Sequence, residues 1–152
     1  MLKIISGDFA DPRVVALLDY HHRTMHVQTP KGSAHALDLT GLQSPAISLW
    51  TIWSGDILAG MGALKTLSPA EGEVKSMRTV EGSLRKGIGS VMLCHIIGAA
   101  RERGMRRISL ETGGSEPFKP AIAFYRAHGF TDYAPFAGYR PDPHSVFMTL
   151  VL

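Results

Sequence analysis

Apolar positions recur with different periods along the chain, and these changes predict its first elements. Residues 2–5 form a short apolar run typical of a strand. Residues 12–27 carry apolar side chains at helical spacing, and Asp11 directly before them supplies an N-cap. Proline and glycine interrupt the pattern over residues 29–43, where we expect only a short helix at 34–39.

The middle of the chain reads as consecutive strands joined by short turns. Residues 47–53 and 57–66 are apolar runs separated by Ser-Gly-Asp, a sequence typical of a hairpin turn. Another turn precedes a third strand at residues 73–80. Strands that follow one another through tight turns pair antiparallel, so this part of the chain predicts a meander.

The last third returns to alternation between helices and strands. Residues 87–103 and 119–128 show helical spacing and end at glycines. Strands are expected at 108–112, 130–136 and 146–151. The complete order is strand, helix, three strands, helix, strand, helix and two strands, which predicts a mixed α/β fold.

Length and composition favour a single globular domain over residues 1–152. Apolar residues make up 45% of the 152 residues and charged residues 19%, which excludes a disordered chain. No apolar run approaches the roughly 20 residues of a membrane helix. The first residues lack the pattern of a secretory signal, so we expect a cytoplasmic protein with no membrane partner.

Charge and metal-ligand content narrow the classes of partner. The net charge of +3 suits an anionic ligand but is too small to indicate nucleic acid. The single cysteine, Cys94, excludes an internal disulfide and any zinc site that needs two cysteines. His22 and His26 have the i,i+4 spacing of a metal-binding pair, but no third ligand accompanies them, so no metal is expected.

The most informative segment is residues 77–93, where a strand enters a Gly-rich turn that leads directly into a helix. Glycines there let a phosphate approach the backbone, and unpaired amides at the helix start point toward it. An ordinary turn with surface cations is the alternative. The pattern differs from both the GxxxxGK[ST] and the GxGxxG phosphate loops. The candidate phosphate-binding residues of this turn are Arg85, Lys86, Gly87, Gly89 and Ser90.

Two motifs resemble those of the GNAT superfamily of N-acetyltransferases. Residues 84–89 match its [QR]xxGx[GA] loop except that Leu84 occupies the first position. Its AxxxYxxxGF signature is matched by Ala121, Tyr125, Gly129 and Phe130. The resemblance covers nearly the whole chain. It implies a central, mostly antiparallel twisted sheet of about seven strands, with helices on both faces and a splay between strands four and five.

The resemblance also implies a site for acetyl-CoA in the gap between the splayed strands. The backbone of Met77, Arg78 and Thr79 would contact the pantetheine arm and the thioester carbonyl. Residues implied to hold the pyrophosphate are Arg85, Lys86, Gly87, Ile88, Gly89 and Ser90, and those on the last helix are Ala121, Phe124 and Tyr125. Phe118 departs from the asparagine that many members carry before this helix.

Acetyl transfer needs a base and a proton donor. An alkyl ammonium is mostly protonated at neutral pH and must lose a proton before it attacks a thioester. The resemblance assigns proton donation to Tyr125. Glu73 is a candidate base because strand alternation places it on the face of Met77 and Thr79. Glu111 and a water chain remain alternatives.

The acceptor is the least determined partner. The first two helices of the family cover the acceptor site, so the resemblance places there the histidines of this region, which are His21, His22, His26 and His35. Arg140, in a turn-rich loop, is a hypothetical partner for an acceptor carboxylate, which would make amino acids candidate substrates.

The favoured interpretation is an acetyl-CoA-dependent N-acetyltransferase that acts on the primary amine of a small molecule and forms a homodimer. The alternatives are a CoA-binding regulatory or sensor module without turnover, and an enzyme that acetylates protein or peptide amines. A sensor would bind CoA and acetylate nothing. An open groove would favour a peptide acceptor, and a roofed pocket would disfavour it.

Overall fold

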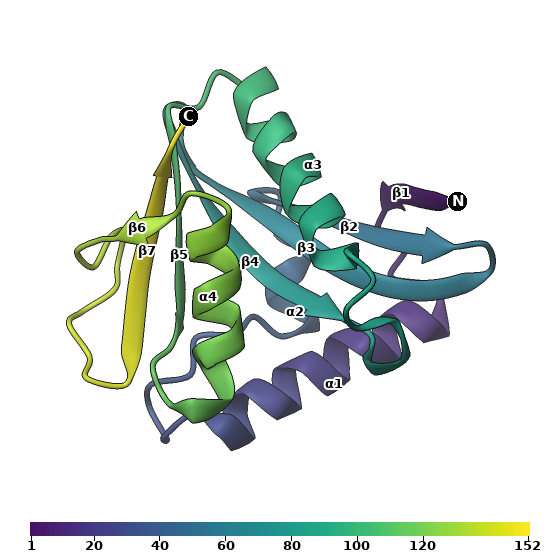
Figure 1. The fold of residues 1–152 in the computed structure, drawn as a ribbon, viewed down its shortest axis with the longest axis horizontal. Coiled ribbons are helices and arrows are strands. Elements are labelled where there is room, and N and C mark those ends of the chain that lie inside the picture. Colours follow the sequence, from purple (N-terminus) through teal and green to yellow (C-terminus); the bar gives the residue numbers. More distant parts are fainter.

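The computed structural model describes residues 1–152 as one seven-stranded sheet with helices on both faces (Figure 1). The strand order is β1-β2-β3-β4-β5-β7-β6, and only β4 and β5 run parallel. The strands are β1 (Leu2–Ser6), β2 (Ile47–Ser54), β3 (Ile57–Ser68), β4 (Glu71–Thr79), β5 (Arg107–Gly113), β6 (Thr131–Asp132) and β7 (Ser145–Val151). The expected mixed α/β fold with a central meander is therefore confirmed.

The helices form two layers. Helices α1 (Pro12–Gln28) and α2 (Leu39–Leu42) cover one face, and α3 (Ile88–Glu102) and α4 (Lys119–Ala127) cover the other (Figure 1). Short 3₁₀ turns, η1 (Glu81–Ser83) and η2 (Glu116–Phe118), precede α3 and α4. None of the helices has the length and apolarity to span a membrane.

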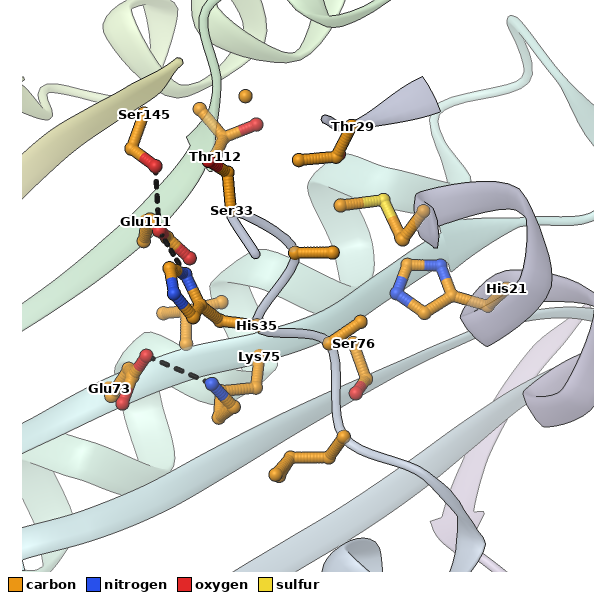
Figure 2. Close-up of a pocket in the computed structure, with 16 residues that line it drawn as sticks. His21, Thr29, Ser33, His35, Glu73, Lys75, Ser76, Glu111, Thr112 and Ser145 are labelled. Atoms are coloured by element: carbon orange, nitrogen blue, oxygen red, sulfur yellow. Dashed lines mark hydrogen bonds and ion pairs between the residues drawn. The ribbon is translucent and has the colours of Figure 1, made fainter. Parts of the chain in front are cut away.

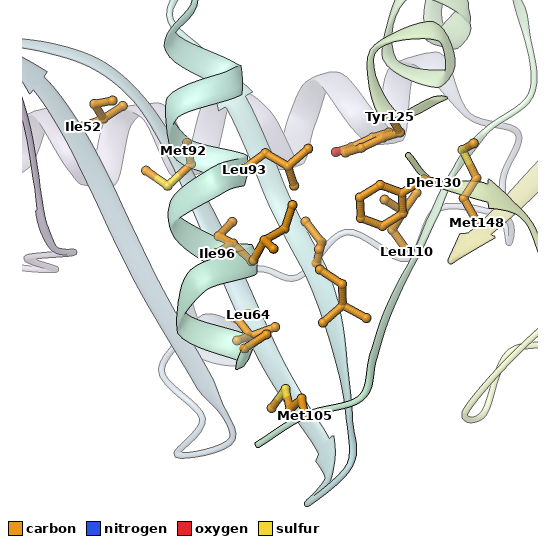
Figure 3. Packing of buried hydrophobic residues seen from close by; sticks show 14 of the residues in the cluster. Ile52, Leu64, Met92, Leu93, Ile96, Met105, Leu110, Tyr125, Phe130 and Met148 are labelled. Atoms are coloured by element: carbon orange, nitrogen blue, oxygen red, sulfur yellow. The ribbon is translucent and has the colours of Figure 1, made fainter. Parts of the chain in front are cut away.

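Two apolar cores hold these layers together. The larger core joins the α3 side of the sheet to α4 and contains Met92, Ile96 and Phe130, all nearly inaccessible (Figure 3). The smaller core packs α1 and α2 on the opposite face through Leu17, Leu42 and other residues. Burial of both sheet faces explains why the central strands read as nearly continuous apolar runs.

Strands β4 and β5 separate soon after they begin to pair. Their register comprises only three pairs, Glu71 with Arg107, Gly72 with Ile108 and Glu73 with Ser109. Beyond these pairs each strand continues without the other as a partner, as Figure 1 shows. The expected splay between the fourth and fifth strands is confirmed, and it opens the sheet in the middle of the molecule.

A β-bulge interrupts β4 within the splayed part. Met61 of β3 pairs with Arg78 and Ala63 pairs with Lys75, so β4 carries one residue more than β3 over this interval. Ser76 lies there with a φ of 54°, in the left-handed region. An extra residue reverses the alternation of side chains between the two faces beyond it.

Two expected elements differ from those observed. The helix expected at 34–39 begins instead at Leu39, because the Asp38 side chain accepts a hydrogen bond from the Gly41 N–H at 2.8 Å and caps the helix there. The strand expected at 130–136 is confined to Thr131–Asp132. Pro135 follows soon after and has no N–H to donate to the ladder.

Candidate active site

The Gly-rich turn before α3 exposes an uninterrupted row of backbone donors. The Leu84 N–H bonds to the Glu81 carbonyl and the Val91 N–H to the Gly87 carbonyl, but no N–H of residues 85–90 has an acceptor in the protein. Arg85 and Gly87 both adopt left-handed backbone, with φ of 61° and 77°. Six consecutive unpaired N–H groups at a helix N-terminus form a ready site for an anion.

The turn lies against the end of β4 and against α4. A Cβ built on Gly89 would lie 3.3 Å from the Phe124 ring and 3.7 Å from Thr79 Oγ1. The absence of a side chain at residue 89 therefore permits the close approach of these three segments. The structure thus brings together Thr79, Gly89 and Phe124, which the resemblance places in one acetyl-CoA site.

A cavity continues from there between the separated strands. Its walls include Met77 and Arg78 from β4, Glu111 from β5, and Ala121 and Tyr125 from α4. Tyr125 is buried beside Phe130, with their ring centroids 5.6 Å apart (Figure 3). Burial raises the pKa of the Tyr125 phenol far above its ordinary value. The hydroxyl therefore keeps its proton at neutral pH, and it has no hydrogen-bond partner in the protein.

His21 and Arg78 join α1 to the wall of this cavity. Arg78 Nε donates to Nδ1 of His21 at 2.9 Å, and the imidazole is only 6% exposed. Burial, with a smaller contribution from the neighbouring Arg78 charge, lowers the pKa of His21 to about 3. His21 is therefore neutral and serves Arg78 as a hydrogen-bond acceptor.

A second cavity adjoins the first and is covered by the segment that follows α1. We call this second cavity the inner cavity, and the two cavities together the cleft. Both cavities share His21, Lys75, Glu111 and other lining residues, and the second also includes His35. His35 Nδ1 lies 2.5 Å from Glu111 Oε2, and Ser145 Oγ donates to the same oxygen at 2.8 Å. Figure 2 shows His35 and Glu111 facing each other, with His21 across the cavity.

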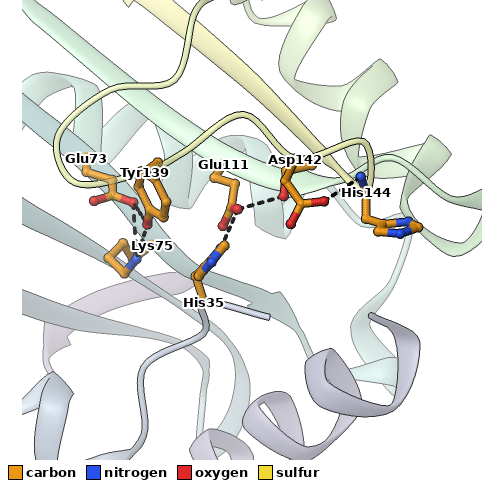
Figure 4. Close-up of polar contacts among 8 residues, drawn as sticks. His35, Glu73, Lys75, Glu111, Tyr139, Asp142 and His144 are labelled. Carbon is orange, nitrogen blue, oxygen red and sulfur yellow. Dashed lines mark hydrogen bonds and ion pairs between the residues drawn. The ribbon is translucent and has the colours of Figure 1, made fainter. Parts of the chain in front are cut away.

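Glu73 also lines the inner cavity, where its carboxylate is held in a buried cluster with Tyr139 and Lys75. Its Oε2 accepts hydrogen bonds from Tyr139 Oη at 2.5 Å and from Lys75 Nζ at 3.1 Å, and Lys75 also contacts Tyr139 at 2.9 Å (Figure 4). Glu73 is 2% exposed. Burial, with a further contribution from Glu73, raises the pKa of the Tyr139 phenol, so Tyr139 remains a donor.

The expectation that Glu73 shares a face with Met77 and Thr79 is wrong. Glu73 borders cavities on the α1 side, whereas Met77 packs against the core beneath α3. The bulge at Ser76 supplies the reason, because the extra residue places Glu73 and Arg78 on one face. Glu111, the competing carboxylate, borders both cavities of the cleft.

An outer cavity of about 550 Å³ lies beside this cluster, a volume suited to a small molecule. It is lined by Lys65, Lys75 and Arg140 as well as by His35 and Glu73. Lys65 and Arg140 form no ion pair, and Asp142 on the same lining forms none either, so two unpaired cations and one unpaired carboxylate face the space. Arg140, the hypothetical partner of an acceptor carboxylate, lines this outer cavity.

His22 and His26 do not line the cleft, contrary to expectation. Their Nε2 atoms lie 3.2 Å apart on α1, and His22 borders a different cavity beside α2. Residues 21 and 22 differ by about 100° around a helix, so His21 faces the sheet while His22 turns aside. No group of three or more His, Cys, Asp or Glu side chains is arranged to hold a metal ion.

Several residues of the cleft were missed from the sequence. Lys75 follows Glu73 by two positions, and strand alternation alone could have placed both on one face. Lys65 could have been found as the cross-strand neighbour of Glu73. Ser145 carries no local signal, because its contact with Glu111 spans 34 residues.

Comparison with known proteins gives a family match over most of the chain. Residues 14–130 match the model of the Acetyltransferase (GNAT) family. The chain is 46% identical over 152 residues to a protein of Escherichia coli K12 named uncharacterized N-acetyltransferase YedL, covering 100% of this chain and 96% of that protein. It is 48% identical over 142 residues to uncharacterized N-acetyltransferase YsnE of Bacillus subtilis 168. That match covers 93% of this chain and 94% of YsnE.

Solved structures show the same fold. A candidate acyl-CoA N-acyltransferase from Klebsiella pneumoniae has a TM-score of 0.83 at 27% identity, covering 100% of this chain and 98% of that one. A Bacillus subtilis acetyltransferase in complex with CoA has a TM-score of 0.71 at 20% identity, and the match covers 100% of this chain and 99% of that one. The latter identity supports the fold alone.

Proposed function

The chain belongs to the GNAT acetyltransferase family, and on that premise we propose that it transfers an acetyl group from acetyl-CoA directly to a primary amine of a small molecule. One observation carries the proposal. The six unpaired N–H groups of residues 85–90 lie at the end of the strand that, with β5, opens the central cleft. A diphosphate held at that turn would direct the attached chain along β4 toward Tyr125.

The residues present fit acetyl-CoA, which would supply an activated acetyl thioester. Residues 85–90 would hold the diphosphate through backbone amides, with Arg85, Lys86 and Ser90 beside them. Loss of the usual Gln or Arg at Leu84 removes a side chain but none of these amides. Beyond Glu73, the edge of β4 that faces β5 has no strand partner, so its backbone groups are free to bind the pantetheine arm.

Tyr125 is the proposed proton donor to the departing CoA sulfur. Its raised pKa keeps the phenol protonated at neutral pH, and its side chain borders the cavity formed by Met77 and Arg78. Glu73 is not assigned as the base, because its Oε2 already accepts two hydrogen bonds and its face of the sheet differs from that of Met77. Glu73 instead fixes the position of Tyr139.

The cavities favour a small acceptor that carries a negative group. Residues 29–37 contribute much of the lining of the inner cavity, which disfavours entry of a folded protein surface. Arg140 and Lys65 at the outer cavity would pair with a carboxylate of the acceptor while its amine reaches inward. We therefore propose amino acids and related small acids as the first acceptors to examine.

The test measures release of the CoA thiol from acetyl-CoA in the presence of each candidate acceptor in turn. The acceptors are amino acids, polyamines, aminoglycosides and peptides. The proposal predicts saturable release that depends on the acceptor, fastest with a small amine that bears a carboxylate, together with the matching N-acetyl product. Binding of CoA without acetylation of any amine would instead support a sensor module. Preference for a peptide over every small amine would contradict the proposed substrate class.

A further inference from the structure

We infer that His35 is the general base of this reaction and that Glu111 is the residue that positions it, an inference that rests on the proposed acetyl transfer. The two side chains come from segments 76 residues apart and meet only in the fold. Their contact is at the boundary of the inner and outer cavities, since His35 borders both. The amine of an acceptor held at Arg140 would arrive at this boundary.

The contact defines which nitrogen of His35 is available. Nδ1 faces Glu111 Oε2 at 2.5 Å, so a carboxylate there retains the ring proton on Nδ1. Nε2 then carries the free lone pair, and no protein group bonds to it. A carboxylate that holds an imidazole in one tautomer and stabilises its charged form is the arrangement used to make histidine a base.

Glu111 is itself fixed in position. Ser145 Oγ donates to Oε2 at 2.8 Å, and the Glu111 side chain is 10% exposed while that of His35 is 35% exposed. The less accessible carboxylate thus lies behind the more accessible imidazole. The Tyr139 ring packs edge-on against His35 with centroids 5.2 Å apart, which limits rotation of the imidazole.

Other charged or titratable groups also face this position. Those lining the same cavities are His21 on α1, Lys65 on β3, Glu73 and Lys75 on β4, and Tyr139, Arg140 and Asp142 on the loop before β7. Glu73 and Lys75 neutralise each other as an ion pair, and His21 donates no charge because it is neutral. Glu111 is therefore the carboxylate in direct contact with the ring.

The proton balance is complete with these residues. His35 Nε2 takes one proton from the acceptor ammonium, which frees the nitrogen lone pair to form the N–C bond to the acetyl carbon. The C–S bond breaks, and its electron pair takes the Tyr125 proton to give the CoA thiol. The new amide nitrogen then loses its surplus proton, and a proton reaches the Tyr125 phenolate through solvent and restores the phenol. The His35 imidazolium gives its own proton to solvent.

The experiment compares wild type with His35→Gln and Glu111→Gln, using His26→Gln as a matched control outside the cleft. With an alkylamine acceptor, His35→Gln should lower kcat about 10²-fold or more, the usual contribution of a general base. Glu111→Gln should lower kcat about tenfold or more, because the His35 imidazole would no longer be held with its proton on Nδ1. Both should bind CoA with unchanged affinity by calorimetry, and His26→Gln should match wild type.

An aminooxy analogue of the same acceptor separates catalysis from structural damage. Its nitrogen is neutral at physiological pH, so it needs no base, and the two variants should approach the wild-type rate with it. The pH profile of kcat/KM for the alkylamine should lose its imidazole-dependent limb in His35→Gln. Equal losses with both acceptors would overturn the assignment, as would an unchanged rate with the alkylamine.

Nitrogen-15 NMR of the histidine side chains tests the pair without turnover. The inference predicts a His35 proton on Nδ1, hydrogen-bonded to Glu111, with a bare Nε2, and loss of this single tautomer in Glu111→Gln. A proton on Nε2 of the resting protein would overturn it. This spectrum tests the contact between His35 and Glu111 even if the wild-type protein acetylates no amine. Absence of acetylation would contradict the proposed function and not this contact.

Discussion

Arg78 Nε and His21 Nδ1, 2.9 Å apart, connect α1 to β4 at the point where the central strands have separated. The bond needs a neutral imidazole, because only an unprotonated Nδ1 accepts a hydrogen bond. Burial keeps His21 in that form by lowering its pKa to about 3. The packing of α1 over the cleft is therefore coupled to the protonation state of one residue.

This coupling predicts acid sensitivity. The folded pKa of His21 lies below its ordinary value of 6.5, so the unfolded chain binds this proton first and stability falls as pH drops below 6.5. The slope is about 1.4 kcal/mol per pH unit, or about 2 kcal/mol in the free energy of unfolding between pH 6.5 and 5. Denaturant unfolding at several pH values measures it. His21→Gln, which cannot titrate, should show a shallower decline; equal slopes would contradict the argument.

The turn before α3 predicts a loss of CoA affinity in Gly87→Ala. Gly87 has a φ of 77°, where an added Cβ costs about 1–2 kcal/mol, so the turn would shift and its N–H groups would diverge. Affinity for CoA by calorimetry should fall about tenfold. Gly82→Ala, at a nearby glycine with open space and no left-handed backbone, is the control. Equal affinities of the two variants would refute a role for this turn geometry.

Tyr125→Phe should separate binding from turnover. Loss of the phenol proton should lower kcat about 10²-fold, the typical contribution of an acid catalyst. CoA affinity should stay near wild type because the ring remains. Stability should change little, since the hydroxyl has no protein partner. Thiol-release kinetics and calorimetry measure these quantities, and a wild-type kcat would remove Tyr125 from the mechanism.

Arg140→Ala should alter acceptor preference. If Arg140 pairs with a carboxylate, KM for an amino acid should rise about tenfold or more, while KM for its amide should not change. Competition between the amino acid and its amide gives the preference directly. Arg106→Ala, an exposed arginine on the turn before β5, changes net charge equally and should have no effect. An unchanged preference in Arg140→Ala would argue against carboxylate recognition by this residue.

Tyr139→Phe should destabilise the fold. Glu73 Oε2 is buried and would lose the phenol that donates to it at 2.5 Å, at a cost of about 1–3 kcal/mol in the free energy of unfolding. Thermal unfolding of Tyr139→Phe, Glu73→Gln and the double variant measures the coupling between the two positions. Additive effects would mean that the contact contributes nothing of its own.

The sequence predicted the meander, the large helices and the Gly-rich turn because each has a local signal. It could not predict the bulge at Ser76, since one added residue leaves the pattern of apolar positions nearly unchanged. That bulge moved Glu73 to the other face from Met77. The pairing of His35 with Glu111 was equally hidden, because it depends on the covering segment after α1 and on the separation of the strands. His21 was different, because the helical period of α1 placed it on the apolar stripe that faces the sheet, and the structure has it buried there.

The central claim is that the amides of residues 85–90 hold the diphosphate of the acetyl donor. Titration of nitrogen-15-labelled protein with CoA, followed by amide NMR, tests it most directly. The account predicts large, saturable shifts of the amide signals of residues 85–90 with CoA, and much smaller shifts of these signals with pantetheine, which lacks the diphosphate. If CoA saturates the protein while these six amides stay unmoved, the account is contradicted.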